Sequence, residues 1–266
     1  MRVLAAILVA ASAAYGQGLG LTETGQDHAH PSLVLEHARV APGSSTTLAV
    51  RFTLSPEWHL YWTNPGDSGD APQVELALPA GVTAGAIQWP VPTRHVLPGD
   101  LLGYLYEEEL VLLIPLEVGA GVKPGAYPIQ AELGWLVCKD VCLMGDDALE
   151  LALEVGPPQA GDAEAKALFA RARARLPRAP KDGELQAELA GDALTLEVPG
   201  ATKLVFFPES TPAAKDSLTA GEVEGERLTI HYGALGDATA LRGILRVTKG
   251  DASYGLQVEV AVPRAD

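Results

Sequence analysis

From Ser32 onward, apolar and polar residues alternate along most of the chain with a period of two. In the segment 47–54 every second residue is large and apolar, and the turn-forming pairs Pro42-Gly43 and Ser55-Pro56 flank it. This pattern predicts a strand with one buried face. Similar runs follow at 73–78, 84–89, 110–116, 127–137 and 148–155. Strands at this spacing are typical of a β-sandwich, which we predict over residues 32–156.

The pattern changes after Gly156, where two prolines follow. In the segment 162–176 apolar residues recur at helical spacing, opposite a face that carries several arginines. This predicts an amphipathic helix inside a linker that covers residues 157–181, with the arginines on a solvated face. The alternation returns in 194–198, 228–230 and 256–262. We therefore predict an all-β protein with a second, smaller β-sandwich over residues 182–266.

The first residues have a different character. Arg2 is followed by a run of about twelve apolar or small residues and by small residues near Gly16, a pattern that predicts a signal peptide over 1–16. That run is shorter than the roughly 20 residues needed to span a bilayer. Residues 17–31 are polar and irregular, and we expect a flexible lead-in. The mature protein is expected to be a soluble periplasmic protein.

Composition narrows the choice of partners. The formal net charge is −15 and the pI is near 4.8, which disfavours nucleic acid and anionic membrane surfaces. No hydrolase triad, phosphate-binding loop or paired-carboxylate pattern stands out in the sequence.

The two cysteines, Cys138 and Cys142, are four positions apart at the end of a predicted strand. An extended strand would separate their Cα atoms by about 13 Å, whereas a disulfide needs about 7 Å or less, so the chain must turn between them if they are bonded. Two cysteines alone do not form a closed structural zinc site. A loop of this size stabilises the fold by only about 2 kcal/mol, against about 4.7 kcal/mol for a 100-residue loop. Both a structural disulfide and a reactive one remain open.

Four segments resemble a known family: WHLYWTNPGDSG at 58–69, Trp89-Pro90, LLGY at 101–104, and WLVCKDVC at 135–142. Together they resemble the periplasmic N-terminal region of the DsbD/ScsB family of transmembrane thiol-disulfide reductases, with the ScsB-like branch closer. The resemblance covers roughly residues 31–155 with specific motifs, and extends more loosely through the helix and the second β region.

The resemblance implies an immunoglobulin-like sandwich that receives electrons from a membrane thiol transporter and passes them to periplasmic thioredoxin-fold proteins. Such a protein would act as a protein-disulfide reductase without a cofactor, in cytochrome c biogenesis or copper tolerance. Cys138 and Cys142 would be the redox pair. The resemblance also implies a cap loop that shields the pair until a partner docks, and its cap or partner-contact candidates are His59, Tyr61, Asp100, Leu101, Leu102 and Tyr104.

The sequence departs from the family pattern at three places. Three residues separate the cysteines, as in the ScsB-like branch, where the best-known DsbD proteins have five. Leu101 and Leu102 stand at the cap position where DsbD proteins have aromatic residues. No transmembrane electron-transfer domain and no thioredoxin domain follow Asp266, so we expect a separate membrane protein to supply the electrons.

Two other functions are consistent with the same residues. Cys138, Cys142 and Met144 are soft ligands that suit Cu(I), with His28, His30 or His59 as additional ligands. Alternatively, the chain is a non-catalytic immunoglobulin-like interaction module with an inert disulfide. The aromatic residues Trp58, Tyr61 and Trp62 are predicted to lie in the core of the sandwich.

Overall fold

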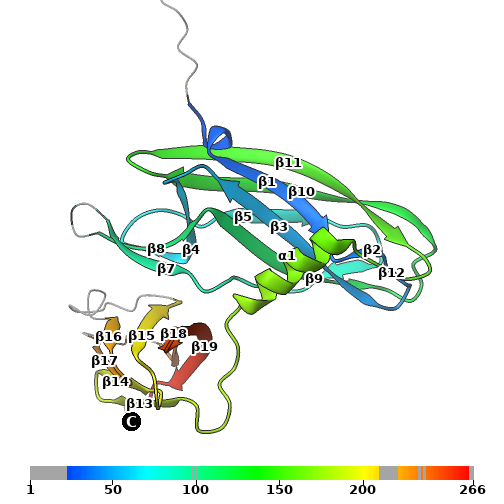
Figure 1. Ribbon diagram of the computed structural model, residues 1–266. Coiled ribbons are helices and arrows are strands. Elements are labelled where there is room, and N and C mark those ends of the chain that lie inside the picture. The colour runs from blue at the N-terminus through cyan, green and yellow to red at the C-terminus, as the bar shows by residue number, and fades with distance from the viewer. Residues whose placement is uncertain are drawn as a thin grey trace, which may run out of the picture.

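The computed structural model describes residues 23–263 except 98, 100, 210–220, 233–234 and 236–237. The expected signal peptide and the first part of the lead-in lie outside these residues. In the described part, nearly all regular structure is β, arranged as two sandwiches with one α-helix between them (Figure 1). No described helix is long and apolar enough to cross a membrane.

The first sandwich contains a four-stranded and a six-stranded sheet. The four-stranded sheet has the order β1 (Ala29–Leu35), β3 (Ser45–Leu54), β9 (Glu109–Val118) and β6 (Val82–Ala84). The six-stranded sheet has the order β11 (Cys142–Val155), β10 (Gly125–Cys138), β4 (His59–Gly66), β8 (Leu101–Glu107) and β7 (Thr93–Leu97), with β5 (Gln73–Ala77) paired to β10. Two short strands, β2 (His37–Arg39) and β12 (Gln159–Ala160), pair beside them. The predicted immunoglobulin-like β-sandwich is confirmed.

The inward-facing residues of the two sheets form the main core. On β3 these are Leu48, Val50 and Phe52, and the Phe52 ring packs edge-on against Trp135 of β10 at a centroid distance of 5.4 Å. Because side chains alternate along each strand, the residues next to them in sequence point to the outer faces of the sandwich. Trp58 and Trp62 also lie in this core, as predicted.

The strand expected at 84–89 does not form. The ladder between β6 and β9 ends at Ala84, which is paired with Leu116. The backbone N–H of Gly85 still donates to the carbonyl of Pro115, at 2.8 Å, but a proline has no N–H to donate in return. Gln88 then forms only an isolated bridge to Leu113.

Order begins earlier than expected at the N-terminal end. The lead-in was expected to reach Pro31, but a 3₁₀ turn, η1 (Gly25–Asp27), and strand β1 from Ala29 already lie within it. Trp135 donates its indole N–H to the carbonyl of Gly25 at 3.3 Å, and the side-chain amide of Gln26 donates to the carbonyl of Asp146 at 2.7 Å. These polar contacts hold the segment against the β10–β11 hairpin, and they leave no hydrophobic pattern in the sequence.

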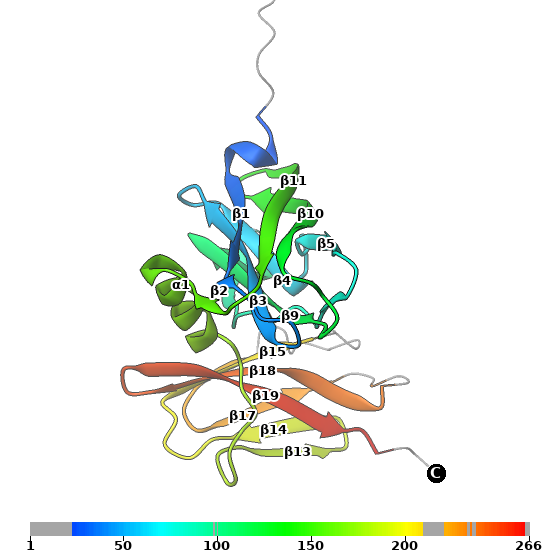
Figure 2. The same cartoon turned by 90° about the vertical axis from the view of Figure 1, so that its right-hand side faces the viewer.

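Helix α1 (Ala163–Ala174) connects the two sandwiches. Asp162 caps its N-terminus by accepting a hydrogen bond from the backbone N–H of Ala165 at 2.8 Å. Its apolar face packs on the outer face of the four-stranded sheet (Figure 2), through Leu168, Phe169 and Ala172 against Ala49, Val111 and Leu113. On the face predicted to be solvated, Arg173 forms an ion pair with Glu36.

The second sandwich is smaller and also has two sheets. One contains β13 (Gln186–Ala190), β14 (Ala193–Glu197) and β17 (Arg227–His231). The other contains β16 (Glu222–Glu224), β15 (Lys203–Pro208), β18 (Ala240–Lys249) and β19 (Ala252–Ala261). Its own core includes Leu196, Leu204, Phe206, Leu245 and Val258.

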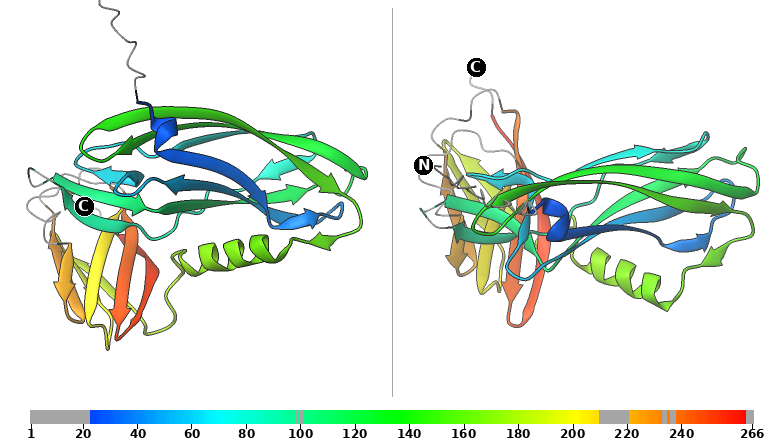
Figure 3. Two further views of the ribbon diagram at one scale, coloured as in Figure 1. Left: turned by 45° about the horizontal axis from the view of Figure 1, so that its top comes forward. Right: turned by 90° about the horizontal axis from the view of Figure 1, so that it is seen from above.

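Strand β15 joins the two sandwiches because both of its faces are buried. Leu204 and Phe206 belong to the core of the second sandwich, whereas Val205 and Phe207 belong to the main core of the first. The Phe207 ring lies edge-on to Tyr104, at a centroid distance of 5.3 Å. The views in Figure 3 show the second sandwich against the β7–β8 side of the first.

Candidate functional site

The two cysteines form a disulfide at the end of the β10–β11 hairpin. Cys138 is the last residue of β10 and Cys142 the first of β11, and the register of the hairpin pairs them with a Cα–Cα distance of 4.1 Å. Within the turn, the backbone N–H of Lys139 donates to the carbonyl of Val141 at 3.1 Å. The strand ends and the chain turns between the cysteines, as the geometry of a disulfide requires.

The two sulfur-bearing residues differ in their access to solvent. Cys138 is only 2% exposed, whereas Cys142 is exposed. Val137 points into the main core, so its neighbours Leu136 and Cys138 point to the outer face of the six-stranded sheet. There Cys138 packs against Tyr61 and Leu105. An attacking sulfur can therefore reach Cys142 more readily than Cys138.

His59 and Tyr61 of β4 lie directly beside Cys138. The register of β10 and β4 pairs Cys138 with His59, and the Nε2 atom of His59 is 3.2 Å from the Tyr61 hydroxyl. Burial lowers the pKa of His59, while Glu107 raises it and His95 lowers it further. Burial also raises the pKa of the Tyr61 hydroxyl. Near neutral pH the His59 and Tyr61 side chains beside Cys138 are therefore uncharged.

The connection between β4 and β5 folds over Tyr61. Gly69 has a φ of +103°, and a Cβ atom at this position would lie 2.3 Å from the Tyr61 ring. The connection is held to β8 by two hydrogen bonds: Asp67 donates its N–H to the carbonyl of Leu102 at 2.8 Å, and Leu102 donates its N–H to Oδ2 of Asp67 at 2.7 Å. We call residues 66–69 the covering turn. It covers Tyr61, which in turn covers Cys138.

The structure places the expected cap residues in different surroundings. Leu102 and Tyr104 are buried in the main core, because alternate residues of β8 point inward, and Leu105 takes the face that carries the disulfide. Leu101 is 41% exposed near the tip of the β7–β8 hairpin, and Asp100 lies outside the described residues. Of the six expected cap or contact residues, His59 and Tyr61 are thus the ones placed beside the pair.

Leu105, Glu107 and Gly69 were missed by sequence reasoning. The alternation in 101–107 carried a signal for the first two, since one face of the strand must point away from the core. The role of Gly69 has no pattern of its own, because it depends on how the chain returns over Tyr61.

Charged residues lie near the disulfide and pair with one another. Lys139 forms an ion pair with Glu57 at 2.6 Å, and this contact lowers the pKa of the Glu57 carboxyl. His95 lies 3.3 Å from Glu107. The turn also presents an apolar residue, Val141, which is 58% exposed.

The expected copper ligands converge only in part. Met144 is 82% exposed, and it lies two residues after Cys142 on the same face of β11. Of the histidines, His59 lies beside Cys138, whereas His28 stacks on Trp58 at a centroid distance of 3.7 Å and His30 pairs with Thr53 on β1. Among the described residues, no group of three or more His, Cys, Asp and Glu is arranged to hold a metal ion.

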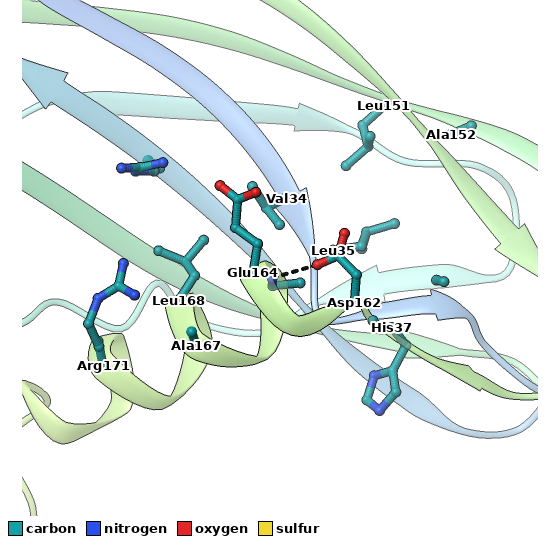
Figure 4. Close-up of a pocket in the computed structure, with 14 residues that line it drawn as sticks. Val34, Leu35, His37, Leu151, Ala152, Asp162, Glu164, Ala167, Leu168 and Arg171 are labelled. Carbon is teal, nitrogen blue, oxygen red and sulfur yellow. Dashed lines mark hydrogen bonds between the residues drawn. The ribbon is translucent and has the colours of Figure 1, made fainter.

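One pocket lies beside the β10–β11 hairpin and another beside helix α1. A groove of about 330 Å³ runs beside the disulfide hairpin, and its lining includes Asp70, Leu136 and Met144. A larger pocket of about 550 Å³ lies between α1 and strands β1 and β11 (Figure 4). Its lining does not include either cysteine.

Comparisons with known proteins match the sandwich that carries the disulfide. Residues 31–154 match the family described as "Thiol:disulfide interchange protein DsbD, N-terminal". The fold is similar to the N-terminal periplasmic domain of ScsB from Proteus mirabilis, with a TM-score of 0.60 and 20% identity over 91% of this chain and 97% of that one. The N-terminal domain of Neisseria meningitidis DsbD in its reduced form matches with a TM-score of 0.33 and 12% identity, over 53% of this chain and 96% of that one.

A search of curated protein sequences finds no match to the chain. The family match covers the first sandwich with its disulfide hairpin, and the ScsB domain shares the fold across both sandwiches. Residues 31–154 thus match the DsbD N-terminal family, and the chain shares its fold with the N-terminal domain of ScsB.

Proposed function

We propose that the Cys138–Cys142 pair exchanges disulfides with thioredoxin-fold proteins of the periplasm, and that a separate membrane thiol reductase returns the pair to its reduced form. The observation that carries this proposal is the placement of one exposed and one buried cysteine on the same short hairpin. Membership of the first sandwich in the DsbD N-terminal family supports it. The periplasmic location of the similar ScsB domain supports the compartment.

The exchange takes two steps. The thiolate of Cys142 attacks one sulfur of the partner's disulfide, which forms a mixed disulfide and releases the first partner thiolate. The thiolate of Cys138 then attacks Sγ of Cys142, which closes the Cys138–Cys142 bond and releases the second partner thiolate. Two electrons pass to the partner, and the two protons lost by the cysteines balance those taken up by the partner's thiolates.

The hairpin favours this order of events. Because the register holds the two cysteines opposite each other, Cys138 is already positioned to resolve a mixed disulfide on Cys142. Tyr61 and Leu105 cover Cys138, so a bulky partner cannot reach it first.

A trapping experiment tests the proposal. Cys138→Ser keeps the exposed nucleophile and removes the resolving one, so an oxidised thioredoxin-fold disulfide isomerase should remain bound through Cys142. The matched variant Cys142→Ser should trap little, because its remaining cysteine is buried. Absence of a trapped species, together with a disulfide that resists mild reductant, would favour the inert interaction module. That alternative expects the double variant Cys138→Ser, Cys142→Ser to fold and bind as the parent does.

The second candidate function is Cu(I) binding by the reduced pair. The observation that favours it is the common face of Cys142 and Met144 on β11, which places a thioether beside the thiols. We expect anaerobic Cu(I) titration of the reduced protein to show competition with a moderate chelator, weakened in Met144→Leu. Failure to compete with that chelator would remove copper binding from consideration.

A further inference from the structure

We propose that Asn64 is a positioning residue through which the second sandwich holds the covering turn over Tyr61, and that it thereby keeps Cys138 covered and directs exchange to Cys142. This inference rests on the proposed exchange function and adds a role for the second sandwich. A series of contacts connects β15 with the disulfide.

The first contact crosses between the sandwiches. Nδ2 of Asn64, near the end of β4, donates a hydrogen bond of 2.7 Å to the carbonyl of Pro208, the last residue of β15. Asn64 is buried, so water cannot replace this partner without opening the interface. The same side chain accepts a hydrogen bond of 3.1 Å through Oδ1 from the backbone N–H of Gly66. One amide group therefore links the second sandwich to the start of the covering turn.

The second contact runs from the covering turn to Tyr61. Gly66 has a φ of +94° and Gly69 a φ of +103°, so the turn follows a path that residues other than glycine rarely adopt. Gly69 lies so close to Tyr61 that its missing Cβ makes room for the ring. If the start of this turn shifts, the contact between Gly69 and Tyr61 must loosen.

The third contact is between Tyr61 and the disulfide. Tyr61, Leu105 and Cys138 form a buried cluster of their own, separate from the main core. Such a small cluster depends on its cover, because it lacks the many apolar neighbours of the main core. Loosening the cover should expose Cys138 while it leaves Cys142 as accessible as before.

The end of β15, where these contacts start, is firmly packed between the two sandwiches. Phe207, which precedes Pro208, packs against Tyr104 and Trp62 of the first sandwich, and the Arg246 guanidinium lies over its ring at 5.5 Å. The carbonyl that Asn64 meets is therefore fixed by an aromatic side chain buried between the sandwiches. This placement makes the second sandwich a support for the covering turn.

Thiol labelling measures the effect directly. The reduced full-length protein is treated with limiting iodoacetamide, and trypsin cleavage after Lys139 places the two cysteines in different peptides for mass spectrometry. The parent should be labelled mainly at Cys142. Asn64→Ala removes the hydrogen bonds to both Pro208 and Gly66, so it should raise the ratio of Cys138 to Cys142 labelling by about fivefold or more.

Two further variants separate the links. Asn64→Asp keeps an acceptor for Gly66 but removes the donor to Pro208, so it should raise the ratio as Asn64→Ala does. Phe207→Leu acts from the second sandwich and should move the ratio in the same direction, which keeps the test usable if one variant folds poorly. The control is Glu222→Gln, which weakens the 3.4 Å contact with Arg94 across the same interface and lies outside the covering turn and Tyr61 cluster.

An unchanged ratio in Asn64→Ala would overturn the inference, and so would an equal rise in Glu222→Gln, since that would indicate general loosening of the interface. Labelling requires no partner protein. Failure of the trapping experiment would therefore count against the exchange function alone, and failure of the labelling experiment against the role of Asn64 alone.

Discussion

Cys138 and Cys142 share one bond and have different surroundings. Cys138 lies beneath Tyr61 and beside the neutral pair of His59 and Tyr61, whereas Cys142 begins an edge strand at the surface. A disulfide with one accessible sulfur is suited to directional exchange, because the partner meets one cysteine and the other resolves the intermediate. A short-loop disulfide adds little to stability, so reactivity is the better reason for the pair.

Gly69 gives a prediction at this scale. Gly69→Ala should lower the free energy of unfolding by about 1–3 kcal/mol, because the new methyl group meets the Tyr61 ring and the residue has a positive φ. Urea denaturation measures this change. The matched control is Gly200→Ala, where φ is +77° and no atom lies within 4 Å of the new Cβ. Equal losses in the two variants would show that backbone strain alone is responsible.

His59 gives a prediction about pH. Its pKa in the folded protein is lowered from the ordinary 6.5, mainly by burial, so the unfolded state binds the proton more readily. Stability from this group is therefore complete above pH 6.5 and is lost as the pH falls from there toward the folded pKa. Glu107 and His95 also act on the His59 pKa, so the effect of His59 itself is isolated by comparing the parent with a His59 variant.

Urea denaturation at pH 7.5 and pH 5.0 provides that comparison. His59→Gln should lose less stability between the two pH values than the parent, because glutamine does not take up a proton. A parent and variant with the same pH dependence would show that His59 does not contribute to it.

At the scale of elements, alternation was the strongest guide. It predicted β3, β9, β10 and, in the second sandwich, β14, β17 and β19, because half-buried strands leave a period-two pattern. It failed where the backbone or a distant contact decides the outcome. The strand expected at 84–89 is absent, because β6 stops at Ala84, before the position opposite Pro115. The 3₁₀ turn η1 is ordered by contacts to Trp135 and Asp146, which follow it by more than 100 residues. Motif order also did not reveal which side chains of β8 point into the main core.

Helix α1 supplies a prediction at this scale. Asp162→Ala removes the side chain that accepts from the N–H of Ala165 and should lower the free energy of unfolding by about 1 kcal/mol. For a chain of this size, the midpoint temperature of thermal unfolding should then fall by roughly 2–4 °C. Asp162→Ser retains a cap and serves as the control. No difference between the two variants would mean that the cap contributes nothing measurable.

At the scale of the whole molecule, the second sandwich packs its β15 strand into the core of the first. The run from Leu204 to Phe207 carried a signal for this, since four consecutive apolar residues suit a strand buried on both faces. The sequence did not reveal which surface would receive Phe207, because Trp62 and Tyr104 are brought together only by the pairing of β4 with β8. Through Asn64 this interface is connected to the covering turn over Tyr61.

The most direct test of the central claim is the transfer of electrons from the reduced protein to an oxidised thioredoxin-fold disulfide isomerase. Free thiols on each protein are counted by mass after alkylation at successive times. We predict that two thiols appear on the isomerase for each Cys138–Cys142 disulfide formed, and that transfer stops in Cys142→Ser. If the isomerase stays oxidised beside the reduced protein, while dithiothreitol reduces it in a parallel sample, the exchange function is contradicted.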